Sequence, residues 1–79
     1  DIDEALDLLI KHLENHDEDH RMYYRIASYS FILGHSEKGY NFLHAALKMN
    51  PKEYILLFEF APFTENLENV SNIIDLYSK

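Results

Sequence analysis

Apolar residues return every three or four positions along most of the chain, which is the spacing of one face of an α-helix. A polar run at 14–19 interrupts the first stripe, and Asp17 or Asp19 can cap a second helix that begins near His20. No stretch alternates with a period of two for long enough to indicate a strand. The first stripe consists of Ile2, Ala5, Leu6, Leu9 and Leu13.

Turn and capping residues set the limits of the next two helices. Gly34 follows the second stripe and is suited to a left-handed helix end, and Ser36 is the expected N-cap of the third helix. The second stripe is Tyr23, Ile26, Ala27, Ser30 and Leu33, and the third is Gly39, Tyr40, Leu43, Ala46 and Leu47.

The pair Asn50-Pro51 is the sharpest local signal, because Asn is a good N-cap and Pro suits the first helical position. Pro62 should end this fourth helix early, since the residue before proline disfavours the α region. A fifth stripe follows at Leu67, Val70, Ile73, Ile74 and Tyr77. The pattern predicts an all-α protein of about five antiparallel helices joined by short turns.

The stripes also repeat at an offset of 34 residues, and two interleaved sets of positions share this period. The corresponding positions are Ala5, Gly39 and Ile73; Leu9, Leu43 and Tyr77; Tyr23 and Leu57; Tyr24 and Phe58; Ile26 and Phe60; and Ala27 and Ala61. A single amphipathic stripe would be common, but two sets with one period indicate a helical repeat.

The chain resembles the tetratricopeptide repeat family, whose units are 34-residue helix–turn–helix pairs. The resemblance is carried by Tyr23, Ile26-Ala27, Leu33-Gly34, Gly39, Leu43, Ala46 and Pro51. Ser30 and Ser36 depart from it, since tyrosines are usual at both positions. The ending FEFAPFTENLENVSNIIDLY also looks like the tail that closes many bacterial arrays of this family.

The resemblance implies a right-handed α-solenoid of antiparallel helix pairs. Residues 1–17 would be the second helix of a preceding repeat, 20–50 the central repeat, and 51–79 a degenerate last repeat with a capping helix. The chain begins at Asp1 without methionine and already in helical rhythm. We therefore expect it to be a segment of a longer array.

In this family the first helices of successive repeats line a concave groove that binds a peptide or a helix. Large aromatic side chains supply much of the energy of such interfaces. An alternative is that Tyr24, Phe31 and Phe58 are buried against the first helix or the terminal cap. The groove positions carried over from the family are Arg21, Tyr24, Ser28, Phe31, Ile32, Ile55 and Phe58.

Charge and composition narrow the range of partners. The formal net charge of −7 opposes binding to nucleic acid, which relies on clustered Lys and Arg. No apolar run approaches the ~20 residues that span a bilayer, so this segment is not expected to contact a membrane. Family members that grip acidic tails share a groove Lys and Asn, where this chain has Tyr24 and Ser28. Zero cysteines exclude disulfides and thiolate sites but indicate no compartment.

The stretch HLENHDEDH offers an alternative chemistry, because His12, His16 and His20 are spaced by four and suit zinc or nickel. We favour a solvated turn with capping Asp residues, since the helical rhythm breaks at 15–19. The chain has no HExxH, no nucleophile elbow and no Gly-rich phosphate loop. No catalytic residue and no cofactor is expected.

The sequence thus predicts a non-catalytic protein–protein interaction module or scaffold, with a protein or peptide as partner. A second hypothesis is a structural C-terminal cap or self-association element. In that case Leu6, Leu8 or Ile10 would face upstream repeats or another copy of the chain, giving a homo-oligomer.

Overall fold

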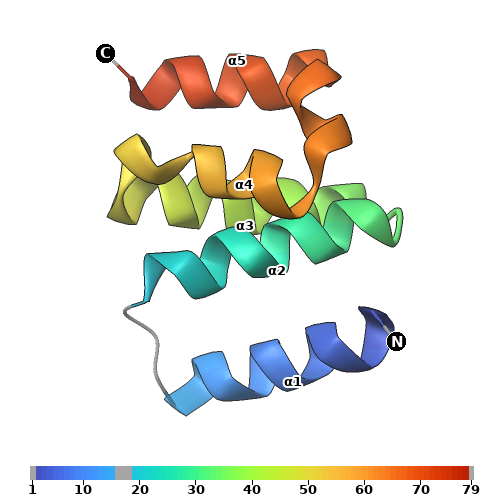
Figure 1. The fold of residues 1–79 in the computed structure, drawn as a ribbon. Helices are drawn as coiled ribbons and strands as arrows, with labels where there is room; N and C mark the ends of the chain where they lie inside the picture. Colours follow the sequence, from blue (N-terminus) through green and yellow to red (C-terminus); the bar gives the residue numbers. More distant parts are fainter. Residues whose placement is uncertain (1, 16–18, 79) are drawn as a thin grey trace.

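The computed structural model describes residues 2–15 and 19–78, and in these ranges it contains helices and turns but no strand (Figure 1). This confirms the prediction of an all-α chain with about five helices. Two short 3-10 segments, η1 (Pro51–Glu53) and η2 (Pro62–Asn66), flank the fourth helix. The α-helices are α1 (Ile2–Asn15), α2 (His20–Ile32), α3 (Ser36–Met49), α4 (Ile55–Phe60) and α5 (Glu68–Tyr77).

The helices follow one another across the molecule, with α1 at one end and α5 at the other (Figure 1). The α2 helix packs against α1, α3 and α4, and α5 packs against α3. The Cα radius of gyration is 11.5 Å, against about 12 Å expected for a compact domain of this length. The described chain is therefore one compact helical unit.

Two of the predicted helix caps are confirmed. The side chain of Asp19 accepts a hydrogen bond from the backbone N–H of Arg21 at 3.0 Å. Asn50 Oδ1 accepts one from Lys52 N–H at 3.2 Å. Each bond satisfies a backbone donor that has no partner inside the helix. Asp17, the other candidate cap, lies outside the described residues.

The α2–α3 turn confirms the role of Gly34 and corrects that of Ser36. Gly34 has φ +82°, and its N–H donates to Phe31 O at 3.1 Å. The N–H of His35 donates to Ser30 O at 2.8 Å, which completes a Schellman motif. This tight turn places His35 at the N-cap, without a side-chain cap bond. Ser36 is instead the first residue of α3, so its prediction as the cap was wrong.

The two prolines behave much as expected. Pro51 opens a single 3-10 turn, and the α-helical part begins only at Ile55. The α4 helix ends at Phe60, two residues before Pro62. The sequence did not predict η2, where the buried Thr64 hydroxyl donates to Ala61 O at 2.7 Å.

One contiguous core joins α2, α3, α4 and α5. Buried hydroxyls do not interrupt it, because those of Ser30 and Thr64 each donate to a backbone carbonyl. Leu6 and Ile26 are also buried but outside this cluster, so α1 adds a separate, smaller contact. The buried members of the cluster are Tyr24, Ala27, Phe31, Leu43, Ala46, Leu47, Leu57, Val70 and Ile74.

Gly39 explains how closely α2 and α3 approach each other. A Cβ built on Gly39 would lie 2.8 Å from Phe31 Cε1 and 2.9 Å from two other atoms of the same ring. Phe31 is only 6% exposed and its ring packs edge to face on Tyr40, with centroids 5.1 Å apart. The ring therefore has little room to move away, and the close contact accounts for a glycine within a helix.

We expect Gly39→Ala to lower the free energy of unfolding by about 1–2 kcal/mol. Overpacking lowers the free energy of unfolding by about 1–3 kcal/mol, and the higher helix propensity of alanine offsets up to about 1 kcal/mol of this loss. In a Phe31→Leu background the same substitution should be neutral or stabilising, because the ring is gone. Urea denaturation of the four proteins measures both effects. A Gly39→Ala protein as stable as the parent would contradict the packing argument.

Candidate functional site

Three of the predicted binding residues lie in the core. Tyr24 and Ser28 are 0% exposed, and Phe31 is nearly buried. The Tyr24 hydroxyl donates to Asn50 O at 2.7 Å. The Ser28 hydroxyl donates to Tyr24 O at 2.8 Å and lies 3.5 Å from Leu57 O on α4. For Tyr24 and Phe31 the structure therefore agrees with the alternative in which they belong to the core, whereas Phe58 is only half-buried.

The position of α4 explains this burial. The α4 helix packs directly on α2, so the stripe that carries Tyr24 and Ser28 faces another helix instead of an open groove. Burial, together with the nearby carboxylate of Glu53, raises the pKa of Tyr24 from 10.0 to about 12. Tyr24 is thus a neutral hydrogen-bond donor inside the fold and is unavailable to a partner in this conformation.

The other predicted positions remain accessible. Arg21 and Ile32 are exposed on α2, and Ile55 is 48% exposed on α4. Phe58 is half-buried and lines an open groove between α4 and α5. Of the aromatic residues that the sequence singled out, Phe58 is the one that a partner can reach.

We call this depression, of about 380 Å³, the α4–α5 groove. Its aromatic wall is formed by Tyr54 and Phe58, whose rings pack edge to face with centroids 5.9 Å apart. The volume is at the low end for ligand pockets, which suits a side chain or a short segment better than an enclosed ligand. The groove is lined by Tyr54, Phe58, Glu65, Ser71, Ile74, Asp75 and Ser78.

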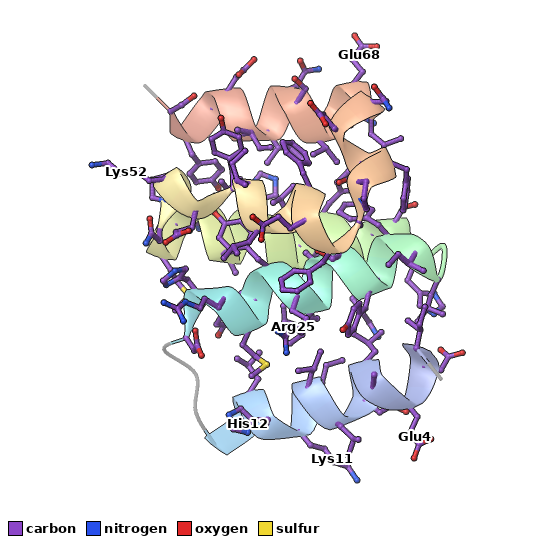
Figure 2. The ribbon with its side chains drawn as sticks, viewed as in Figure 1. Glu4, Lys11, His12, Arg25, Lys52 and Glu68 are labelled. Carbon is purple, nitrogen blue, oxygen red and sulfur yellow. The ribbon has the colours of Figure 1, made fainter. Side chains whose placement is uncertain are left out.

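The charge of the α4–α5 groove has one sign. Glu65 and Asp75 are exposed at its edge, and no Lys, Arg or His is among the described residues that line it. Asp75 and Ser78 belong to the C-terminal end of α5, which is the negative end of the helix dipole and has no basic residue in its last turn. Lys52, two residues before Tyr54, extends away from the helices (Figure 2).

A second groove lies between α1 and α2. Its most exposed apolar side chain is Leu8, at 61%. Figure 2 shows Arg25 at the edge of α2 that faces α1, and the Arg25 guanidinium carbon lies 4.8 Å from the centre of the Phe60 ring. This α1–α2 groove is therefore apolar with a positive edge. It is lined by Ala5, Leu8, Leu9, His12, Met22, Arg25 and Tyr29.

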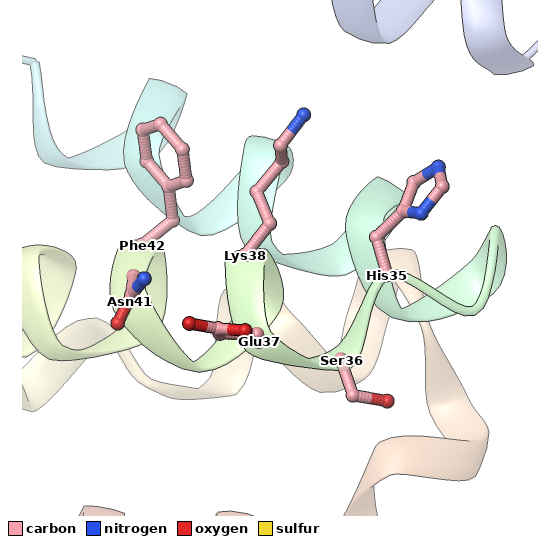
Figure 3. A pocket seen from close by; sticks show the side chains of 6 residues that line it. All are labelled: His35, Ser36, Glu37, Lys38, Asn41 and Phe42. Carbon is pink, nitrogen blue, oxygen red and sulfur yellow. The ribbon is translucent and has the colours of Figure 1, made fainter.

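A third depression lies at the start of α3. His35, Lys38 and Phe42 point to the same side of the helix, and Glu37 also lines the depression (Figure 3). Phe42 packs on Tyr23 with ring centroids 5.9 Å apart, so it mainly serves the α2–α3 contact. The mixed charges define no single ligand chemistry, and we assign this depression no function.

The described residues give no support to the metal alternative. Among the side chains that the structure describes, those of 2–13 and 19–78, no three His, Asp or Glu residues gather closely enough to hold a metal ion. His20 lies 3.4 Å from Asn50 Nδ2 and packs edge to face on Tyr24. His16, the middle member of the proposed set, lies outside the described residues.

Sequence reasoning missed most of the α4–α5 groove. A signal was present, since Tyr54 and Phe58 are four residues apart and such residues are neighbours on a helix. Glu65 lies in η2, which the periodicity did not predict, and the apolar stripe of the fifth helix does not include Asp75. The groove depends on how α5 packs, which spacing along the chain does not reveal.

Comparison of the chain with protein-family models, with curated proteins and with solved structures finds no match. Among the described residues, no helix is both long enough and apolar enough to cross a membrane.

Proposed function

We propose that this protein is a non-catalytic protein–protein interaction module that binds a peptide segment of its partner in the α4–α5 groove. The observation that carries this proposal is the half-buried pair Tyr54 and Phe58 beside an open groove. Aromatic anchors in such a setting are typical of the few residues that dominate binding energy. The module gives the partner a rigid surface made by packed helices.

We also propose that the helices form a right-handed solenoid of the tetratricopeptide type. The 34-residue offset supports this, because it relates Tyr24 to Phe58 as equivalent positions of two successive repeats. The neighbours of these two residues differ. Tyr24 is covered by α4, the first helix of the next unit, whereas Phe58 in the last unit faces a groove beside α5. The end of the array would then expose a position that interior repeats bury.

Peptides selected for binding from a displayed random library test the proposal. We expect their complexes to shift the backbone NMR signals of α4 and α5. Phe58→Ala should weaken binding by tenfold or more, the range of interface hot spots. Leu8→Ala, which changes an exposed side chain in the α1–α2 groove, is the matched control and should leave affinity within twofold.

The proposal fails if the selected peptides bind a folded Phe58→Ala protein as tightly as the parent, or if their shifts map to the α1–α2 groove. Circular dichroism and melting curves of both variants are recorded first, because Phe58 also packs against the core.

A second function, self-association, is favoured by the exposure of Leu8 at 61% beside Ala5 and Leu9. Burying this apolar face in a copy of the chain would remove it from water. Sedimentation velocity at rising protein concentration should then show a dimer that Leu8→Glu abolishes. A monomer up to millimolar concentration would eliminate this function.

A further inference from the structure

We infer that the segment bound in the α4–α5 groove presents a lysine or arginine side chain, whose cationic head lies between the Tyr54–Phe58 pair and the carboxylates of Glu65 and Asp75. This inference rests on the proposed function and names the chemistry of the partner. It follows from three properties of the groove: its rings, its charges and its shape.

The rings favour a cation. Tyr54 and Phe58 are both half-buried and meet edge to face, so part of their ring surface lines the groove. The face of an aromatic ring carries partial negative charge and attracts an ammonium or guanidinium group. The same kind of contact occurs within the protein, where Arg25 lies over the Phe60 ring.

The charges favour the same ligand. Glu65 comes from η2 and Asp75 from α5, so two separate elements bring their carboxylates to one groove. None of the described lining residues supplies a countercharge. The C-terminal end of α5 adds the negative end of its dipole on the same side. An acidic segment would be repelled, whereas a basic one gains attraction that also speeds its encounter.

The shape suits a long side chain with an apolar stem. Ile74, which is 8% exposed, and Phe58 supply apolar surface, and the two carboxylates lie at exposed positions. Lysine and arginine lay their methylene stems along apolar surface while the charged head stays near water. A partner's Lys or Arg would therefore match both parts of the groove. The α1–α2 groove, with Arg25 at its edge, lacks this match.

Three fluorescein-labelled 12-residue peptides serve as probes. They share the same leucine positions and carry lysine, glutamine or glutamate at all the others. Fluorescence anisotropy at low salt should show the lysine peptide binding about tenfold more tightly than the glutamine peptide, the combined effect of two exposed ion pairs and a cation–π contact. The glutamate peptide should bind more weakly than either.

Variants separate this site from general electrostatic attraction. Glu65→Gln/Asp75→Asn should reduce the affinity for the lysine peptide about fivefold, because the two ion pairs are lost and the cation–π contact remains, and it should leave the glutamine peptide within twofold. The control Glu4→Gln/Asp7→Asn removes two exposed acidic charges from α1, at the far end of the molecule, and changes the net charge equally (Figures 1 and 2). It should leave the lysine peptide within twofold.

Each contrary result has a distinct meaning. If the lysine and glutamine peptides bind equally and Phe58→Ala weakens both, the charge inference falls and the proposed function stands. If the two double variants weaken the lysine peptide equally, the attraction comes from net charge alone and the inference is overturned. If no peptide binds, or if binding is indifferent to Phe58→Ala, the inference and the proposed groove fall together.

Discussion

Replacing Leu57 by alanine is expected to lower the free energy of unfolding by about 2–5 kcal/mol, the range for truncating a fully buried leucine. Leu57 is 0% exposed, and it is the buried side chain of the six-residue helix α4. Domains of this size have only about 5–15 kcal/mol of stability. The variant should therefore be partly or wholly unfolded at 37 °C, as urea denaturation and far-UV circular dichroism would show.

Ile55 offers a control within the same helix. Its side chain is 48% exposed, so Ile55→Ala should cost no more than about 1 kcal/mol. The two variants remove aliphatic side chains from positions two residues apart, and their difference isolates the effect of burial. Equal losses at Leu57 and Ile55 would mean that α4 does not pack on α2 in the way described.

Tyr24 should make the protein less stable at alkaline pH. Below pH 10 the side chain is protonated in both the folded and the unfolded chain, so its titration costs no stability. Between pH 10 and about 12 the unfolded chain loses this proton while the folded chain, whose pKa is raised to about 12, retains it. Stability therefore falls over this window by about 2–3 kcal/mol, which is about 1.4 kcal/mol for each unit of pKa difference.

Comparison with Tyr24→Phe separates this effect from the five other tyrosines and the lysines. At neutral pH the variant should be less stable by about 1 kcal/mol, because it lacks the hydrogen bond to Asn50 O. Urea denaturation between pH 8 and 12 should then show a smaller alkaline loss in the variant. Parallel curves over the whole range would contradict the placement of a neutral, buried Tyr24 hydroxyl.

The helix limits could be predicted closely where a backbone rule acts locally. Gly34 supplies a left-handed residue, Asp19 and Asn50 cap, and Pro62 prevents continuation, and each effect depends on its immediate neighbours alone. Ser36 is not the cap, because the hydrogen bond from His35 N–H to Ser30 O closes the turn one residue earlier than predicted and α3 already begins at Ser36. The 3-10 segment η2 has no apolar periodicity, so pattern analysis did not reveal it.

The candidate site could be predicted only in part. Tyr24 and Phe58 occupy equivalent positions, and the period of 34 predicts the same role for both. Their burial differs because α4 covers Tyr24, whereas Phe58 borders the α4–α5 groove. A repeat period shows which residues correspond to one another. It does not show the contacts of the last unit, because these depend on how α5 packs and the other units have no such neighbour.

The succession of helices from α1 to α5 has a mechanical consequence (Figure 1). A force applied through the two ends of the chain would pull on the helix interfaces in series, because the ends lie on opposite sides of the molecule. Among residues 2–13 of α1, Leu6 alone is fully buried, whereas α2 and α3 share a continuous core. Under tension the α1–α2 interface would therefore part before the α2–α3 interface.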